Sequence, residues 1–145
     1  MHVHSIIAQK KIHETITIKP TDLVKTAAEL LAKHRIGAVI VTRDGSIADG
    51  ILSERDIVRS LATTGVGCMN LRAEELMTHE VIGCRPDDTA HSVMERMTEG
   101  RFRHMPVVDG GRMIGVISIG DVVKARLAEI ESENTALTGM ITNTW

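Results

Sequence analysis

One stretch of the sequence, Gly50-Ile51-Leu52-Ser53-Glu54-Arg55-Asp56, returns 65 residues later as Gly115-Val116-Ile117-Ser118-Ile119-Gly120-Asp121. Each copy begins with a short apolar run, which is typical of a buried strand. A serine ends the run and a carboxylate follows three residues later, which is the spacing of a residue pair that begins a helix. The sequence therefore predicts the same strand–helix junction twice, and with it a duplicated unit.

The residues before the first copy predict a strand and a helix. Residues 15–18 alternate between polar and apolar side chains, as a half-buried strand does, and Pro20 ends the strand. Thr21 or Asp22 can cap the helix that follows. The apolar side chains expected on one face of that helix are Leu23, Ala27, Leu30 and Leu31.

A hairpin then leads into the first copy. Residues 36–41 form a continuous apolar run that predicts a buried strand, residues 43–45 predict a turn, and residues 47–52 predict the returning strand. From Ser53 onward the sequence predicts a helix. Its expected core-facing side chains are those of Ile57, Val58 and Leu61.

The second half repeats this order, with a helix followed by a hairpin over residues 105–117. Matched positions support the alignment of the halves, since Pro86 follows Pro20 by 66 residues and His104 follows Gly37 by 67. We expect five segments: an N-terminal arm (1–11), a first repeat (12–64), a linker (65–77), a second repeat (78–128) and a C-terminal helical tail (129–145).

Composition limits the classes of protein to which the chain can belong. Its 145 residues are 43% apolar and 25% charged, enough for one domain or for two small halves that share a core. A net charge of −2 and only two aromatic residues, Phe102 and Trp145, argue against a nucleic-acid binder. No apolar run is long enough to cross a membrane, and the first residues lack the pattern of a signal peptide. We expect a cytoplasmic protein in which Cys68 and Cys84 are reduced, buried thiols.

These features together resemble a tandem cystathionine-β-synthase (CBS) domain pair, also called a Bateman module. The resemblance rests on both Gly-x-x-Ser-x-x-Asp segments, on the strand-proline-aspartate-helix openings and on Arg103-His104-Met105-Pro106-Val107-Val108-Asp109, and it covers residues 12–128. It implies an α/β (α+β) fold of two β-α-β-β-α units, packed sheet to sheet with pseudo-two-fold symmetry, and a C-terminal helical extension.

The same resemblance implies a function. CBS pairs bind adenosine ligands in the clefts between their units, so we expect a regulatory sensor of AMP, ADP, ATP, S-adenosylmethionine or NAD(H), without catalysis of its own. We expect a homodimer that acts on a regulated protein, with neither nucleic acid nor membrane as partner. The alternative is a structural protein with vestigial clefts that dimerises and scaffolds a partner. An enzyme is disfavoured because the sequence shows no nucleophile with a base and no metal site.

The two Ser-x-x-Asp motifs are the first candidates for ligand contact. Ser53 and Ser118 can donate a hydrogen bond to a phosphate oxygen at a helix start. Asp56 and Asp121 can each accept hydrogen bonds from both hydroxyls of a ribose. The competing interpretation is a capping box, in which serine and aspartate satisfy only the N–H groups of the helix itself.

Phosphate recognition requires cationic groups, and these are unevenly distributed between the copies. Arg101, Arg103 and His104 precede the second hairpin, whereas the first copy has Arg35 there and Arg55 beside its aspartate. We expect the second cluster to serve the second Ser-x-x-Asp motif, which should then bind the nucleotide more tightly. The alternative is a solvated basic turn.

The resemblance also implies an apolar slot in which the adenine hydrogen-bonds to main-chain groups. Neither a Gly-x-x-x-x-Gly-Lys loop nor a Gly-x-Gly-x-x-Gly fingerprint is present. The candidate slot residues are Ile16, Ile36, Gly37 and Ala38 in one cleft, and Val81, Ile82, Met105 and Pro106 in the other.

The two ends of the chain carry separate expectations. His2 and His4 can chelate a metal, but a flexible terminus that includes His13 is the preferred interpretation. The tail has apolar residues at the spacing of a coiled-coil seam, with one polar residue that would fix the register. The seam positions are Val123, Leu127, Ile130, Asn134, Leu137 and Ile141. The tail is expected either to dimerise through this seam or to pack on its own domain and fray after Glu133.

Overall fold

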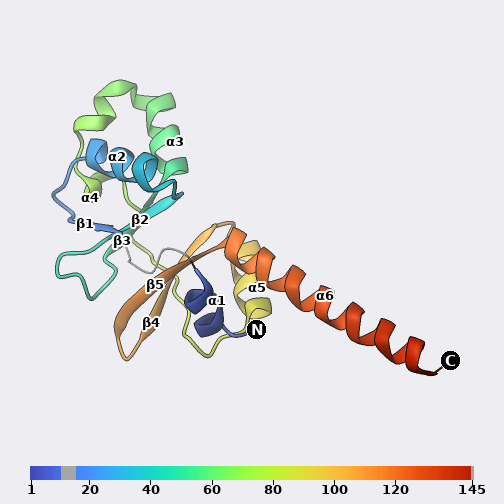
Figure 1. The fold of residues 1–145 in the computed structure, drawn as a ribbon. Coiled ribbons are helices and arrows are strands. Elements are labelled where there is room, and N and C mark those ends of the chain that lie inside the picture. The colour runs from blue at the N-terminus through green and yellow to red at the C-terminus, as the bar shows by residue number, and fades with distance from the viewer. Residues whose placement is uncertain (11–15, 145) are drawn as a thin grey trace.

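The structure, a computed structural model, describes residues 1–10 and 16–144, with side chains up to residue 136. Its first half holds a three-stranded sheet with the helices gathered to one side (Figure 1). In this sheet β2 pairs in parallel with β1 and antiparallel with β3, as the predicted β-α-β-β-α order requires. The elements of this half are β1 (Thr17–Ile18), α2 (Val24–His34), β2 (Ala38–Val41), β3 (Gly50–Ser53), α3 (Glu54–Thr64), the 3-10 helix η1 (Val66–Asn70) and α4 (Ala73–Leu76).

The second half repeats this arrangement in shortened form. Its elements are α5 (Ala90–Gly100), β4 (His104–Asp109), β5 (Arg112–Ser118) and α6 (Ile119–Thr144). β4 and β5 form an antiparallel hairpin, and an isolated parallel bridge between Cys84 and Val107 stands where the first half has β1. Cys84 N–H donates to the Pro106 carbonyl and Val108 N–H donates to the Cys84 carbonyl, so the parallel connection is kept.

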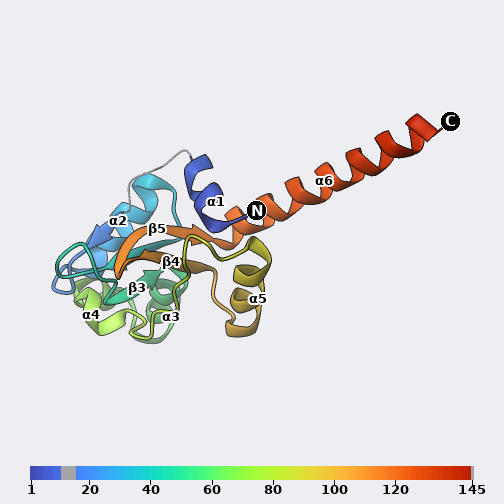
Figure 2. The same cartoon turned by 90° about the horizontal axis from the view of Figure 1, so that it is seen from below.

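The N-terminal arm is a helix and not the flexible terminus that the sequence predicted. This helix, α1 (Val3–Gln9), packs on the second half (Figure 2). Val3 and Ile6 are buried in the core of that half, and Val3 N–H donates to the Asp88 carbonyl over 2.9 Å. Apolar side chains three residues apart give the arm a face to bury, and this drives it to fold on the repeat.

Each half has its own hydrophobic core, so the two halves do not share a single one. The buried members of the first core are Ile18, Val24, Ala27, Leu31, Val39, Val41, Leu52, Ile57 and Ala73. Those of the second are Val3, Ile6, Cys84, Ala90, Val93, Met97, Met105, Val107, Ile117, Val122 and Ala125. The buried side chains of the first core are all aliphatic, and the second core adds the sulfur-containing Cys84, Met97 and Met105, as a chain nearly without aromatic residues requires.

The returning strand of the first hairpin is shorter than predicted. It begins at Gly50 and not at residue 47, because the Asp44 carboxylate accepts hydrogen bonds from the N–H groups of Ser46 and Ile47. An aspartate that binds the main chain two and three residues ahead holds it in a turn.

Two predicted helix features of the first half are also wrong. The Asp22 carboxylate accepts a hydrogen bond from Lys19 N–H, so it does not cap α2, whose N-cap is Leu23. On α3, Ile57 is buried but Val58 is 63% exposed, because α3 packs through a narrower face than its apolar residues suggest.

The last helix, α6, leaves the second repeat and projects well beyond it (Figures 1 and 2). It continues to Thr144, so the expectation that it frays after Glu133 is wrong. The side chains of Leu137 and Ile141 lie outside the described residues. The seam positions with exposed apolar side chains are Val123, Leu127 and Ile130. Among the helices described, none combines the length and the apolar character that a membrane crossing demands.

Candidate functional site

Both Ser-x-x-Asp motifs form capping boxes at the start of a helix. In the first copy, Asp56 N–H donates to Ser53 Oγ over 3.3 Å and Ser53 N–H donates to Asp56 Oδ2 over 3.0 Å. In the second copy, the corresponding bonds from Asp121 N–H and Ser118 N–H measure 3.1 and 2.9 Å. The capping interpretation is therefore confirmed for both copies. Capping still leaves Oδ1 of each aspartate without a hydrogen bond to the described residues.

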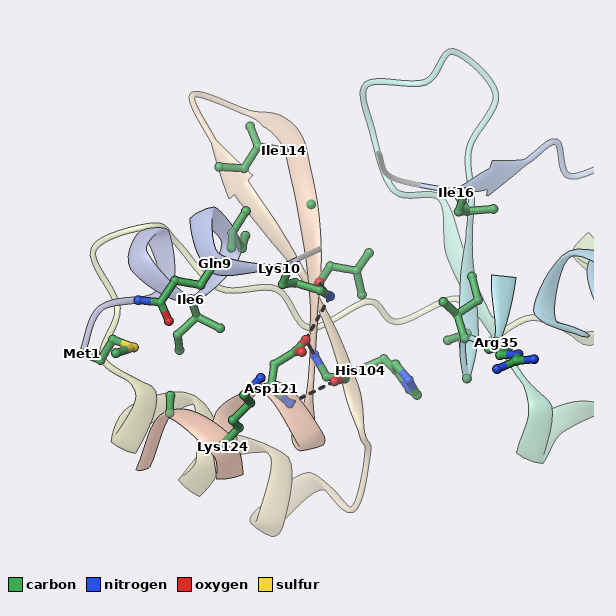
Figure 3. Close-up of a pocket in the computed structure, with 18 of the residues that line it drawn as sticks. Met1, Ile6, Gln9, Lys10, Ile16, Arg35, His104, Ile114, Asp121 and Lys124 are labelled. Carbon is green, nitrogen blue, oxygen red and sulfur yellow. Dashed lines mark hydrogen bonds and ion pairs between the residues drawn. The ribbon is translucent and has the colours of Figure 1, made fainter. Parts of the chain in front are cut away.

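A cavity of about 510 Å³ lies at the start of α6, between the two repeats (Figure 3). This volume falls in the usual range for a small-molecule site. The predicted residues that line it are Ile16, Arg35, Ile36, Gly37 and Ala38 from the first repeat and His104, Ser118 and Asp121 from the second. One cavity thus combines the slot predicted in one repeat with the Ser-x-x-Asp motif of the other.

The repeats meet where Gly37 faces His104, two positions that match in the alignment of the halves. A Cβ atom on Gly37 would lie 2.8 Å from Cε1 and Nε2 of the His104 ring. The glycine is therefore required by this close approach, which lets the imidazole lie against the main chain of the first repeat.

Lys10, the C-cap residue that follows α1, contacts Asp121 in this cavity. Its Nζ atom lies 2.9 Å from Asp121 Oδ2 and donates to the Val116 carbonyl over 2.8 Å (Figure 3). Burial alone would raise the pKa of Asp121, but the hydrogen bond from Ser118 and the Lys10 ammonium outweigh it and hold the pKa below its ordinary value. Asp121 is therefore a carboxylate at neutral pH.

Burial lowers the pKa of His104, because the protein interior stabilises the imidazolium less well than water does. The carboxylates of Glu54 and Asp121 oppose this effect, and the cations Lys10 and Arg103 reinforce it. His104 is therefore neutral at pH 7. It offers the cavity a hydrogen-bonding ring and not the positive charge expected of it for phosphate.

The cations that line the cavity differ from those expected. Arg101 and Arg103 have exposed side chains and do not line it, whereas Arg35 of the first repeat does. Arg35 and Arg101 hold matched positions, each as the left-handed residue after a helix, with φ of 54° and 57°. Because the repeats face each other, the arginine that lines the same cavity as Asp121 comes from the opposite repeat.

The other predicted contacts lie apart from this cavity. Met105 is fully buried in the second core, where its side chain serves packing, and Ile82 is 51% exposed. The predicted residues that do not line the cavity are Ser53, Arg55, Asp56, Val81, Ile82, Arg101, Arg103, Met105 and Pro106.

The helix α1 contributes a wall that sequence reasoning missed. Ile6, Ile7, Gln9 and Lys10 line the cavity, as does Lys124 of α6. No motif marks these residues, because their role depends on how the arm packs. The spacing of Val3 and Ile6 was the signal that could have indicated it.

The histidines and cysteines outside the cavity are the remaining candidates for a metal or redox site. The described residues contain no group of three or more side chains suited to a metal ion. The rings of His2 and His4 stack with their centroids 5.4 Å apart, and His13 lies outside the described residues. Cys68 and Cys84 are free and buried, as expected, and burial raises the pKa of Cys84 to about 12, so this thiol is protonated.

Comparison with known families agrees with the duplicated architecture. The CBS domain model matches the chain twice, over residues 7–63 and 73–128. The chain belongs to the CBS domain family. The tandem CBS pair that the repeated motif predicted is thereby confirmed.

Curated relatives include larger proteins. The CBS domain-containing protein CBSX3, mitochondrial, of Arabidopsis thaliana is 34% identical over 124 residues. The match covers 83% of this CBS pair and 60% of the relative, so the chain spans less than two thirds of that protein.

Solved structures confirm an α/β fold with two CBS repeats and a C-terminal helix. The CBS-domain containing protein ATU1752 from Agrobacterium tumefaciens is 41% identical, with a TM-score of 0.81 over 86% of this chain and 92% of that one. The CBS domain pair of protein MJ0100, in complex with 5′-methylthioadenosine and S-adenosyl-L-methionine, is 25% identical. Its TM-score is 0.78 over 89% of this chain and 98% of that one.

Proposed function

We propose that this CBS pair is a regulatory sensor that binds an adenine nucleotide in the cavity between its repeats. The observation that carries the proposal is the composition of the cavity, where Ser118 and Asp121 at a helix start share one space with residues 36–38 of the other repeat. A CBS pair of similar fold holds two adenosyl ligands, which supports the same ligand class here.

Each wall of the cavity suits one part of a nucleotide. Ile16 and Ile36 offer apolar contact for the adenine ring, and the main chain of Gly37 and Ala38 offers hydrogen-bonding groups for its edge. The Asp121 carboxylate can accept from both ribose hydroxyls, a charge-assisted interaction. Such a ligand would touch both repeats at once.

The charges around the cavity favour an anionic ligand. Lys10, Arg35 and Lys124 line it, and Asp121 is the sole acidic residue among the described residues that do. AMP, ADP, ATP and NAD(H) carry phosphate groups that such cations attract, whereas S-adenosylmethionine carries a sulfonium cation. This imbalance supports the nucleotides over S-adenosylmethionine as the proposed ligands of this chain.

Regulation follows from a ligand that bridges two repeats. A bound nucleotide favours the arrangement of the repeats that binds it best, and it shifts the population by its differential affinity alone. A homodimer mate or a regulated protein in the cytoplasm would detect that shift, and no catalysis is needed.

Thermal unfolding with nucleotides tests this proposal. AMP, ADP, ATP or NAD at a concentration of 100 times its Kd should stabilise the protein by about 2.7 kcal/mol, which raises the melting temperature by roughly 5–10 °C. Asp121→Ala should remove most of this shift. Asp56→Ala is the matched control, since it removes the same capping carboxylate from the other copy, outside the cavity.

Two results would contradict the sensor function. The first is a melting temperature that none of the four nucleotides changes at millimolar concentration, and the second is an equal loss of response in both variants. The exposed apolar side chains of α6 would then favour the alternative, a dimeric scaffold with vestigial clefts.

A further inference from the structure

The helix α1 is outside both repeats in sequence, yet it is fixed to the second repeat in space. Val3 is fully buried and Ile6 nearly so, both in the second core. His4 N–H donates to the Pro86 carbonyl over 3.0 Å, and the Ile7 side chain lies against Gly115. These contacts hold the end of α1 at the cavity and give Lys10 a defined position.

Lys10 neutralises the carboxylate that the proposed ligand needs. Its ammonium bonds both Asp121 and the main chain of Val116, and the side chains of Lys10 and Asp121 are only 28% and 23% exposed. An ion pair so far withdrawn from water is costly to break unless each member finds a new partner.

In the part of the first repeat that the structure describes, no lysine takes this place beside Asp56. The Asp56 carboxylate bonds only Ser53, and no ion pair involves it in the described part of the chain. Lys10 therefore distinguishes one copy of the motif from the other, although the two capping boxes have the same geometry.

We propose that Lys10 is a specificity-determining residue of the cavity, which admits an adenosine ligand to Asp121 only if the ligand also carries a phosphate. The inference rests on the proposed nucleotide-binding function. A ribose that engages both carboxylate oxygens takes the place of Lys10 on Oδ2, and the released ammonium then needs another anion. A phosphate supplies that anion, whereas an unphosphorylated nucleoside leaves the ammonium with the Val116 carbonyl but without a counter-ion.

The neighbouring charges strengthen this selection. Asp121 is the one acidic residue among the described residues that line the cavity, so a released Lys10 ammonium finds no second carboxylate there. Arg35 and Lys124 line the same cavity and repel it. A phosphorylated ligand replaces the ion pair of Lys10 with Asp121 by one of Lys10 with its phosphate. An uncharged nucleoside breaks the first pair and supplies no second.

Calorimetric titration with AMP and adenosine tests the inference. The wild-type protein should bind AMP at least tenfold more tightly than adenosine. In Lys10→Met the ratio of the two affinities should fall about tenfold, with adenosine binding more tightly than before, because Asp121 is then free. Lys10→Arg should keep the wild-type ratio, since it keeps the charge.

Lys25→Met is the matched control, because Lys25 is an exposed lysine of α2 that does not line the cavity. Should Lys10→Met be poorly folded, Lys10→Gln gives the same comparison. An unchanged affinity ratio in a folded Lys10 variant that still binds AMP would overturn the inference and leave the sensor function intact. Failure of wild-type protein to bind either compound would overturn both.

Discussion

A methyl group at Gly37 would collide with the His104 ring, because the position allows no Cβ atom without a shift of the imidazole. Gly37→Ala should lower the free energy of unfolding by about 1–3 kcal/mol, as overpacking of a tight contact does. Gly67→Ala is the control, since a Cβ there meets nothing within 4 Å. Urea denaturation measures both, and equal stability of the two variants would show that the contact is not tight.

The double variant Gly37→Ala with His104→Ala separates this collision from other effects of the alanine. Removal of the ring opens the space that the methyl group needs, so the double variant should lose less stability than the sum of the single changes. Additive losses would contradict the contact.

The lowered pKa of His104 also predicts that the stability of the protein depends on pH. Burial lowers its pKa in the folded protein below the value near 6.5 of the unfolded chain, so the unfolded state binds more protons in the interval between them. The neutral His104 ring therefore contributes to the free energy of unfolding above pH 6.5. This contribution is lost as the pH falls toward the pKa of the folded state, at less than about 1.4 kcal/mol per pH unit.

Urea denaturation of wild type and His104→Gln at pH 7.5 and 5.5 measures this contribution. The wild-type protein should lose more stability than the variant between the two pH values, and the other histidines cancel in the comparison. An equal loss in both proteins would show that His104 titrates as it does in the unfolded chain.

At the scale of elements, α6 carries a row of exposed apolar side chains. Val123, Leu127 and Ile130 are 43%, 55% and 44% exposed and share the seam spacing. Val58, the counterpart of Val123 on α3, is also exposed, so both repeats leave the same helix position uncovered. The seam dimer expected from the sequence would place these side chains in its interface.

The variant Leu127→Glu with Ile130→Glu should weaken that dimer at least tenfold, because two charges would enter an apolar seam. Ser132→Glu places one charge on the opposite side of α6 and should leave the mass in solution unchanged. Sedimentation equilibrium measures the assembly, and circular dichroism checks the fold. A double variant that keeps the wild-type mass would exclude this seam as the interface.

Most elements could be predicted from the sequence because their signals are local. The motif at Ser53 and its copy at Ser118 identified two strand–helix junctions. Pro20 and Pro86 identified where the first helix of each repeat follows its strand. The returning strand was predicted too long because one side chain, Asp44, redirects the main chain. The exposure of Val58 depends on which other helices α3 meets, and no local pattern contains that information.

At the scale of the whole molecule, the sequence predicted several residues that line the cavity but not which of them lie together. Sequence reasoning grouped Asp121 with Arg101 and Arg103 because they belong to one repeat. The cavity instead joins Asp121 to Arg35 across the boundary and to Lys10 of the arm. Such pairings follow from how the repeats face each other, and neither repeat encodes that orientation by itself.

The burial of α1 in the second core also constrains how the chain folds as it is synthesised. Val3 and Ile6 are made before Ile117 and Val122, members of the same core, which follow 111 to 119 residues later. At the usual pace of translation these apolar side chains wait several seconds without their partners, while the first repeat can already fold. The first repeat should therefore fold early, and the second should close last, by a contact of high sequence separation that makes this step the slower one.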